Sequence, residues 1–340
     1  MINGMQHFGK GTWKTDETYS FYKKFFGYKI KLNDLTVRAK AMEPVVGSVE
    51  KMRMMMAANA KGGAIVEIVE HKSSPIRPYP VHGGYGSYGI LEVGFGVRGI
   101  EKVAADFKSQ GVNFLTPICE LDLDGGRRWR YTYLEDPDGL RLQLVEDIWP
   151  NKPEATTPEV RGAVHIGIGV SNLERSTEFY QSALGFDRLV YEFEGYIQEM
   201  DPLTGGALPM KLAILERSAL VTGPISILPS GTVKLFEVPG FQGQHIYKGR
   251  RWGDIGCMEL CMDVTDLEGT VAEMEAKGIA IYLPPVEMDM GTGCKGMVAY
   301  VRDPDGTIVE FVEIKTVAWV SAKTFMYLAM PLLKLYDRFT

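Results

Sequence analysis

The chain has 340 residues, which is long for one hydrophobic core and favours two domains. Its net charge of −6 and the lack of a basic stripe give no reason to expect nucleic-acid binding. Residues 1–7 show no basic or apolar segment, so we expect no secretory signal. The four cysteines are Cys119, Cys257, Cys261 and Cys294, and they lack the spacing of a zinc knuckle. We therefore expect reduced thiols in a cytoplasmic protein.

A first motif occurs near the N-terminus and again in the second half of the chain. Each copy has a His-x-Gly-x-Gly strand, a helix with a Phe-Tyr pair, and a glycine that ends the helix. His7 and His165 are 158 positions apart, as are Gly27 and Gly185. Alternate side chains of a strand share a face, so His165 has glycines beside it and aliphatic residues on the opposite face. A lone hydrogen-bonded histidine and a ligand-binding histidine are both compatible with this pattern.

A second motif also occurs twice, at a constant offset of 167 residues. Its copies are a strand at 92–97 or 259–264, a helix, and an Asp-Pro-Asp-Gly turn at 136–139 or 303–306. A β-rich run follows each turn. The chain therefore contains four units of a strand, a helix and several strands, and we place them at 1–72, 85–150, 160–238 and 254–315.

The expected domain division follows the linker near residues 149–155, which contains prolines. We expect a first domain at 1–150, a second domain at 151–315, and a C-terminal apolar helix at 316–340.

These motifs, in order and in duplicate over residues 1–315, resemble the vicinal oxygen chelate superfamily, which includes glyoxalase I, bleomycin resistance proteins and extradiol dioxygenases. The resemblance implies an α+β fold with four βαβββ modules paired into two open eight-stranded barrels, each around a site. Modules can pair within or between the halves of the chain, and the sequence leaves this open.

In that superfamily the metal ligands lie early in the first strand and within the last strand of each module. Carried over residue by residue, the positions of the second half are His165, Lys234, Glu259 and Glu310. The resemblance implies that the histidine and the two glutamates among them bind a metal. The positions of the first half are His7, Glu67, Glu92 and Gln143, similar to the four ligands of glyoxalase I with one histidine replaced.

The chemistry of these residues fits a divalent ion, because unpaired carboxylates inside a barrel would be costly. One imidazole and two carboxylates leave positions open for substrate oxygens, and the ion would act as a Lewis acid. Fe²⁺, Mn²⁺, Mg²⁺, Ni²⁺ and Zn²⁺ are the candidates. The catalytic candidates are Glu310, Lys234 and Tyr300, with Tyr300 donating a hydrogen bond to substrate and Lys234 acting as a base or binding a carboxylate.

Other readings of the same residues remain open. Lys234 can form a salt bridge with Glu259 or Glu310 and leave no metal. Gln143 opposite Glu92 can be a plain hydrogen-bonded pair in a structural first site. Cys257 and Cys261 alternate with Glu259 on one strand face and would then flank the second site, although small core residues are the commoner case.

The function we expect is that of a metal-dependent enzyme acting on a small oxygenated organic substrate, either an isomerase or lyase, or a ring or 2-oxo acid dioxygenase. Non-oxidative chemistry is favoured because extradiol dioxygenases use two histidines, and the second histidine position here is Glu259. The competing hypothesis is a non-catalytic small-molecule binding protein of the bleomycin-resistance type.

The tail after residue 316 is strongly apolar, and Pro331 predicts a kink in its helix. Lys323 and Lys334 argue against a membrane-spanning helix. We favour docking over a barrel mouth or on a second subunit of a homodimer, rather than contact of 317–340 with a membrane surface.

Overall fold

The structure is a computed structural model, and it describes residues 1–38, 40, 43–48, 51–79, 84–151, 157–219, 231–291, 293–317 and 320–321. The elements of the first two modules are β1 (Ile2–Gly11), α1 (Thr15–Phe26), β2 (Ile30–Val37), α2 (Glu43–Val46), β3 (Met52–Ala58), β4 (Ile65–His71), β5 (Gly89–Arg98), α3 (Ile100–Ser109), β6 (Cys119–Asp122), β7 (Arg128–Glu135) and β8 (Arg141–Ile148). Those of the rest are β9 (Glu159–Gly169), α4 (Leu173–Ser182), β10 (Arg188–Tyr196), α5 (Asp201–Thr204), β11 (Pro209–Glu216), β12 (Thr232–Glu237), β13 (Gly256–Val264), α6 (Leu267–Ala276), β14 (Ile281–Asp289), β15 (Lys295–Arg302), β16 (Ile308–Val317) and β17 (Val320–Ser321).

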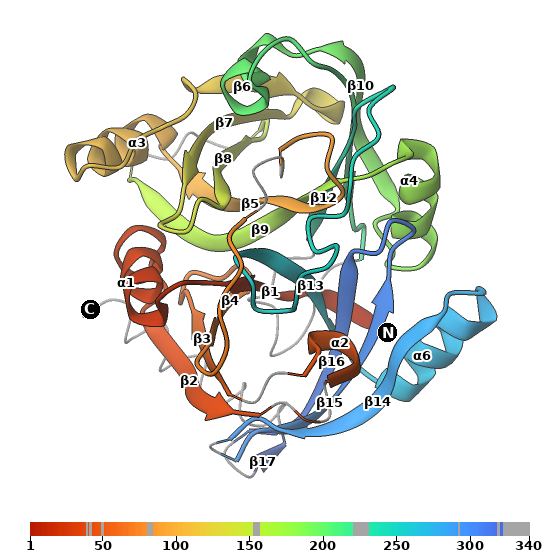
Figure 1. The fold of residues 1–340 in the computed structure, drawn as a ribbon. Coiled ribbons are helices and arrows are strands. Elements are labelled where there is room, and N and C mark those ends of the chain that lie inside the picture. Colours follow the sequence, from red (N-terminus) through yellow and green to blue (C-terminus); the bar gives the residue numbers. More distant parts are fainter. Residues whose placement is uncertain are drawn as a thin grey trace.

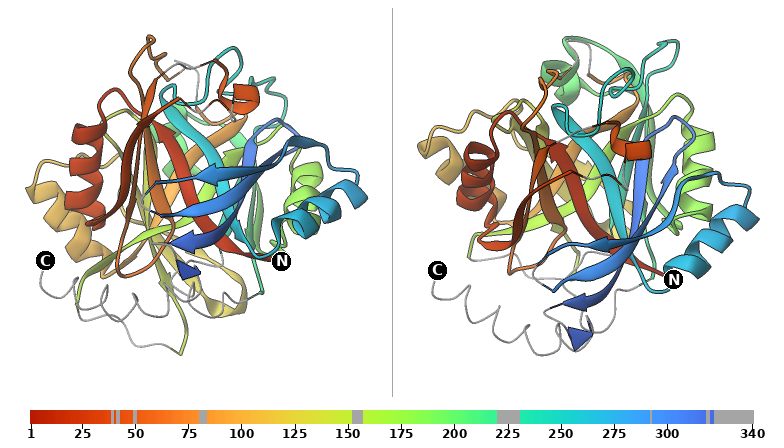
Figure 2. Two further views of the ribbon diagram at one scale, coloured as in Figure 1. Left: turned by 90° about the horizontal axis from the view of Figure 1, so that it is seen from below. Right: turned by 60° about the horizontal axis from the view of Figure 1, so that its bottom comes forward.

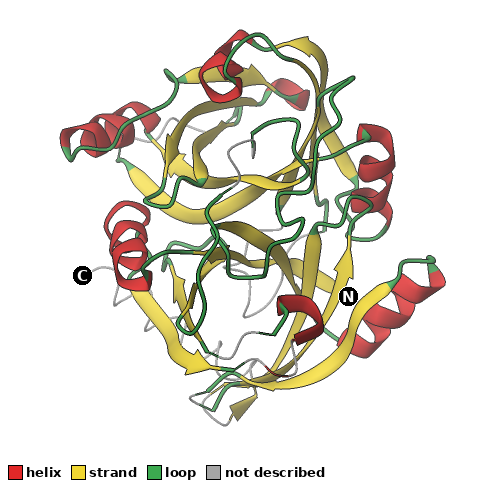
Figure 3. Cartoon of the chain, viewed as in Figure 1, coloured by secondary structure: helices red, strands yellow, loops and turns green. Residues whose placement is uncertain are grey.

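The strands form two curled mixed sheets, one above the other in Figure 1, and this confirms the α+β class with paired βαβββ modules. The lower sheet, called the first barrel, has the order β14-β15-β16-β13-β1-β4-β3-β2, with β17 added at β16. The upper sheet, called the second barrel, has the order β10-β11-β12-β9-β5-β8-β7-β6. Figure 3 shows that helices cover the outer sides of both sheets.

The modules pair across the halves of the chain, so the sheets do not follow the predicted division into 1–150 and 151–315. The first barrel joins the first and fourth modules through the antiparallel strands β1 and β13. The second barrel joins the second and third modules through β5 and β9. β9 follows β8 in the chain and pairs with β5, while β1 pairs with β13 of the last module.

Alternate residues of the central strands face different cores. Phe8 of β1 and Leu260 of β13 share one core with Phe95 of β5 and Ile166 of β9, so this core joins the two sheets. The residues next to them in sequence face the hollow of their own barrel. Figure 2 shows α1 with α3 on one side of this layered arrangement and α4 with α6 on the other. The predicted strand faces are therefore confirmed, with the aliphatic face packed between the barrels.

The two repeated motifs meet in the structure. Tyr22 in α1 donates a hydrogen bond to Asp136 of the first Asp-Pro-Asp-Gly turn at 3.0 Å. Tyr180 in α4 donates in the same way to Asp303 of the second turn, also at 3.0 Å. Gly27, with φ of 64°, ends α1 as predicted. Consecutive modules are thus linked by their motifs even though they belong to different barrels.

Lys10 makes a buried connection between β1 of the first barrel and the turn that precedes β8 in the second. Its ammonium pairs with Asp136, and with Asp138 at 2.7 Å, and the side chain is 0% exposed. Burial lowers the pKa of Lys10, but the two carboxylates raise it above its usual range. The fixed charge on β1 therefore holds the two sheets in one relative position.

Replacing Lys10 by methionine is expected to lower the free energy of unfolding by about 3–5 kcal/mol, because it leaves buried carboxylates without a cation. Urea denaturation followed by circular dichroism measures the loss. The control is Arg175→Ala, which breaks an ion pair with Asp305 through a half-exposed arginine and should cost below about 1 kcal/mol. Equal losses in the two variants would contradict the assigned role of Lys10.

The predicted helix at 316–340 falls mainly outside the described residues. The described part is different from the expectation, because Thr316 and Val317 continue β16, and residues 320–321 form β17 against it. β-branched side chains of this kind favour an extended strand. Within the described ranges, no helix is long and apolar enough to span a membrane. All four cysteines are free thiols, as predicted.

Candidate metal centre

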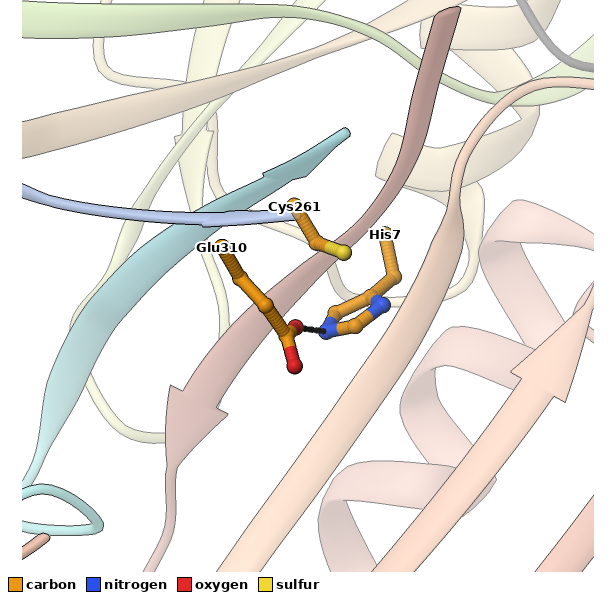
Figure 4. Close-up of side chains that lie close together, drawn as sticks. All are labelled: His7, Cys261 and Glu310. Atoms are coloured by element: carbon orange, nitrogen blue, oxygen red, sulfur yellow. Dashed lines mark ion pairs between the residues drawn. The ribbon is translucent and has the colours of Figure 1, made fainter. Parts of the chain in front are cut away.

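Four side chains from four neighbouring strands converge inside the first barrel. They are His7 of β1, Glu67 of β4, Glu259 of β13 and Glu310 of β16. The Nε2 atom of His7 lies 3.1 Å from Glu310 Oε2, 3.6 Å from Glu67 Oε2 and 3.8 Å from Glu259 Oε1. All four residues are at most 5% exposed. Figure 4 shows His7 and Glu310 turned toward each other, with the thiol of Cys261 beside them.

Three of the converging atoms have no hydrogen-bond partner. These atoms are His7 Nε2, Glu259 Oε1 and Glu310 Oε2. The other ring nitrogen of His7 lies 2.5 Å from Gln6 Oε1. Because an amide oxygen only accepts, Nδ1 carries the proton, and Nε2 is left to face the carboxylates. Buried polar atoms without partners are unusual, and their convergence on one point indicates a bound cation.

The glycine of the His-x-Gly-x-Gly strand makes this convergence possible. A Cβ at Gly9 would lie 2.5 Å from Glu259 Oε1, so only glycine leaves room for that carboxylate beside β1. Hydrogen bonds to the other oxygen of Glu259 and of Glu310 fix the orientation of these two carboxylates. Trp252 Nε1 donates to Glu259 Oε2 at 3.0 Å, and the hydroxyl of Tyr300 donates to Glu310 Oε1 at 2.7 Å. Each carboxylate thus keeps its second oxygen for the centre.

The charge of the cluster requires compensation. Burial raises the pKa of Glu67 well above its usual range, and the neighbouring Glu259 and Glu310 raise it further. Burial likewise raises the pKa of Glu259. Three carboxylates in one buried site repel each other, and a divalent ion removes both this repulsion and the desolvation cost. One imidazole and three carboxylates match the hard divalent ions and leave coordination positions open.

The second barrel has the corresponding positions but a different set of side chains. They are His165 of β9, Lys234 of β12, Glu92 of β5 and Gln143 of β8. Lys234 Nζ lies 3.1 Å from Glu92 Oε1 and donates to the Tyr133 hydroxyl at 2.7 Å. His165 Nε2 lies 3.5 Å from the same glutamate oxygen. Gly94 leaves room for the ring of His165, and Gly167 leaves room for the side chain of Glu92.

The second cluster already carries its own cation. Burial raises the pKa of Glu92, but Lys234 and the hydrogen bond with His165 lower it to about 2, so the carboxylate is ionised. Burial lowers the pKa of His165, which keeps its ring neutral. The positive charge of Lys234 therefore balances the single carboxylate. Among the residues that the structure describes, no group suited to hold a metal ion occurs at this cluster.

The structure regroups the residues that the sequence indicated. The predicted set of His165 with Glu259 and Glu310 is wrong, because His165 lies in the other barrel and His7 takes its place. Lys234 is likewise away from Glu259 and Glu310, and its salt bridge is to Glu92. The predicted first set is divided as well, since the glutamate and glutamine of the second module accompany His165. The physical reason is the pairing of β1 with β13 and of β5 with β9.

Some smaller expectations also change. The side chain of Gln143 has no hydrogen bond, so it does not pair with Glu92. Cys261 does flank the candidate centre, whereas Cys257 packs in the core between the barrels. An irregularity in the pairing of β1 with β13 at Gly9 and Lys10 alters the alternation there. Gln6 was not among the predicted site residues, although its position next to His7 in the sequence could have indicated a hydrogen bond with that ring.

Comparisons with known proteins agree with this architecture. Residues 162–311 match the family model described as Glyoxalase/Bleomycin resistance protein/Dioxygenase superfamily. Among solved structures, glyoxalase I from Zea mays is 17% identical with a TM-score of 0.54, covering 97% of this chain and 95% of that chain. A putative dioxygenase from Bacillus subtilis is 12% identical with a TM-score of 0.58, covering 99% and 96%. A search of curated proteins found no match.

These findings confirm the resemblance to the vicinal oxygen chelate superfamily. At such low identities the two solved structures show the shared fold, and the family model adds a sequence match over residues 162–311 to the superfamily of glyoxalases, bleomycin resistance proteins and dioxygenases. The matched segment contains the third and fourth modules, which lie in different barrels. The cluster around His7 is the part of the described chain whose donor set fits a divalent metal ion.

Proposed function

We propose that this protein is a divalent-metal-dependent lyase or isomerase of the glyoxalase type, with its site at His7, Glu67, Glu259 and Glu310. The observation that carries the proposal is the convergence of unpartnered ligand atoms in the first barrel. One histidine with three glutamates lacks the second histidine expected of an extradiol dioxygenase, which favours proton transfer beside a carbonyl over oxygen chemistry.

The ion would act there as a Lewis acid toward the oxygens of a small carbonyl substrate. The chain itself supplies proton carriers and their orientation. Glu310 Oε2 is unpartnered while Oε1 accepts from Tyr300, so this carboxylate is held in one orientation. Its Oε2 would either hold the ion or, when it does not, take a proton beside the carbonyl. Burial raises the pKa of Tyr300 well above its usual range, which keeps its hydroxyl a donor.

Lys234 was expected to take part in catalysis, but its ammonium lies with Glu92 in the second barrel. The non-catalytic hypothesis rested on Lys234 and Gln143. Because both residues belong to the second barrel, they give no argument against a metal in the first.

The direct test is elemental analysis of the full chain purified without chelators, followed by assays of two reaction types. We expect one divalent ion per chain and isomerisation of a hemithioacetal formed from a 2-oxoaldehyde and a thiol. Oxygen uptake with catechols or 2-oxo acids tests the oxidative alternative. A chain that holds only traces of metal and gains no activity after reloading would refute the proposal.

Replacing Tyr300 by phenylalanine is expected to weaken metal binding by about 10–100-fold, the range typical for loss of a group that orients a ligand. The variant removes the hydrogen bond to Glu310 and leaves all four ligands in place. Competition with a metallochromic indicator measures the affinity. Tyr133→Phe is the matched control, because Tyr133 occupies the same position in the second barrel; an equal effect there would contradict the assignment.

Metal affinity is expected to rise steeply with pH. Burial lowers the pKa of His7, but Cys261, Glu259 and Glu310 raise it well above its usual range. The pKa of Glu67 is raised as well. Without the ion these groups hold protons at pH values where exposed histidine and glutamate have lost them, and each ligand must lose its proton to bind. Calorimetry in buffers of different ionisation enthalpy should show proton release; a pH-independent affinity would be the contrary result.

A further inference from the structure

The second barrel encloses a cavity of about 210 Å³ beside Lys234. Six of its fourteen lining residues are aromatic, among them Trp129, Tyr131, Tyr191, Phe193 and Phe236. The first two lie on β7, the next two on β10, and the last on β12. Strands β7 and β10 are far apart in the order of the sheet, so the curl of the sheet brings them together around the cavity. A concave aromatic pocket with a few polar groups is typical of small-molecule sites.

Gln143 gives this cavity an unsatisfied polar end. Its side chain is 0% exposed and lines the cavity, and neither Oε1 nor Nε2 has a hydrogen-bond partner. A buried amide without partners is costly, because one acceptor and two donors are lost to water without replacement. The cost is understandable if a ligand supplies both an acceptor and a donor at this point.

Lys234 also lines the cavity, and its ammonium contacts the hydroxyl of Tyr133, which stands opposite Gln143 on the neighbouring strand. An ammonium has three N–H groups, and those of Lys234 have two acceptors, Glu92 and the Tyr133 hydroxyl. Among the described residues no third acceptor for Lys234 Nζ occurs. The remaining N–H is therefore available to a ligand oxygen.

The charges around the cavity favour a neutral ligand. The charge of Lys234 is balanced by Glu92, whose pKa is about 2. The other charged lining residues are Glu120 and Glu199, which are exposed and acidic. A carboxylate or phosphate ligand would meet no net positive charge at the inner end and repulsion at the outer end.

The aromatic walls favour a flat ligand. The rings of Tyr191 and Phe193 lie nearly parallel on one wall, with an interplanar angle of 10° and centroids 6.5 Å apart. On the other side Trp129 stacks on His165 at an angle of 19°. Flat ring faces bind another aromatic ring by offset or edge-on stacking.

We propose that this cavity is a metal-independent binding site for a neutral aromatic molecule with a carboxamide-type group. The carboxamide oxygen accepts from Lys234 and from the Gln143 amide, and its N–H donates to Gln143 Oε1. The ring lies between the walls formed by β7 and β10. The first barrel thus holds the metal centre, and the second barrel holds an organic ligand at the corresponding position.

The experiment is a titration of the full chain with benzamide, followed by calorimetry or ligand-observed NMR. Benzoate tests the preference for a neutral group, and cyclohexanecarboxamide tests the need for a flat ring. We expect saturable binding of benzamide, and binding weaker by about tenfold for the other two compounds, as for loss of one good polar or stacking contact.

Two variants separate a ligand site from a structural role. Gln143→Leu is expected to weaken benzamide binding by about tenfold or more while it raises the melting temperature, because an apolar side chain of similar size removes the unsatisfied amide. Phe193→Ala, at a partly exposed position, should weaken binding without loss of folding. A residue with only a structural role would not show opposite effects on stability and binding.

Glu310→Gln, which is expected to lose the metal, should bind benzamide as the parent chain does. The proposal is overturned if benzamide shows no saturable binding, or if Gln143→Leu binds it with unchanged affinity. It is also overturned if Glu310→Gln abolishes binding, since the ligand would then occupy the first barrel. Failure of the metal proposal leaves all of these results unchanged, so the two proposals are tested separately.

Discussion

Glu310→Gln is expected to remove the metal from the first barrel while the protein stays folded. The substitution replaces the carboxylate whose Oε2 lies 3.1 Å from His7 Nε2. The amide oxygen can still accept the hydrogen bond of Tyr300, so the local packing is retained. The loss of affinity should exceed the roughly 10–100-fold that follows from loss of an orienting group. Equilibrium dialysis against Mn²⁺ or Zn²⁺ with elemental analysis measures it, and the proposed isomerase activity should be lost in parallel.

The folded state of this variant is checked by thermal unfolding without metal, where a small change is expected because one of three mutually repelling carboxylates has gone. Addition of metal should stabilise the parent chain and leave Glu310→Gln unaffected. Retention of stoichiometric metal by the variant would show that His7 and Glu310 do not hold the ion.

Glu92→Gln is expected to have the opposite pattern, with a large loss of stability and no change in metal content. The substitution leaves the ammonium of Lys234 buried without a counter-charge, which typically costs about 3–5 kcal/mol. Glu92 also accepts hydrogen bonds from Tyr85 and Tyr133, and these contacts weaken with the charge. Urea denaturation gives the free energy of unfolding, and elemental analysis gives the metal content.

The double variant Glu92→Gln with Lys234→Met is the control for this second prediction. Removal of both charges should restore much of the stability, because the cost arises from the unpaired ammonium and not from the lost glutamate itself. A double variant as unstable as Glu92→Gln alone would mean that the ion pair is not the cause. Loss of metal in Glu92→Gln would place a metal ligand in the second barrel, against the present assignment.

The pair of experiments compares one chemical change at two related places. Both substitutions convert glutamate to glutamine at the ligand positions of a barrel. In the first barrel the glutamates outnumber the cations of the chain, and an external ion is needed. In the second barrel Lys234 occupies the position of Glu67, and Gln143 occupies that of Glu310, so the cluster is balanced from within. The same substitution therefore affects binding in one barrel and folding in the other.

The sequence by itself determined the modules, because their signals are local. The constant spacings of the histidine strands and of the Asp-Pro-Asp-Gly turns depend on strand alternation, helix ends and turn geometry within a few residues. The resemblance that these motifs carry implied eight ligand positions, and the side chains at those positions limited the chemistry to metal binding or internal ion pairing.

Only the tertiary structure decided which of these residues share a site. The four modules have similar strands, so the alternation of side chains does not tell β13 from β9 as the partner of β1. The folded chain pairs β1 with β13 and β5 with β9, and Phe8 and Phe95 share the core between the two sheets. Pairing of the first and fourth modules brings His7 next to Glu310, more than three hundred residues further along the chain. Pairing of the second and third modules brings Lys234 next to Glu92. A contact between such distant segments has no local signal in the sequence.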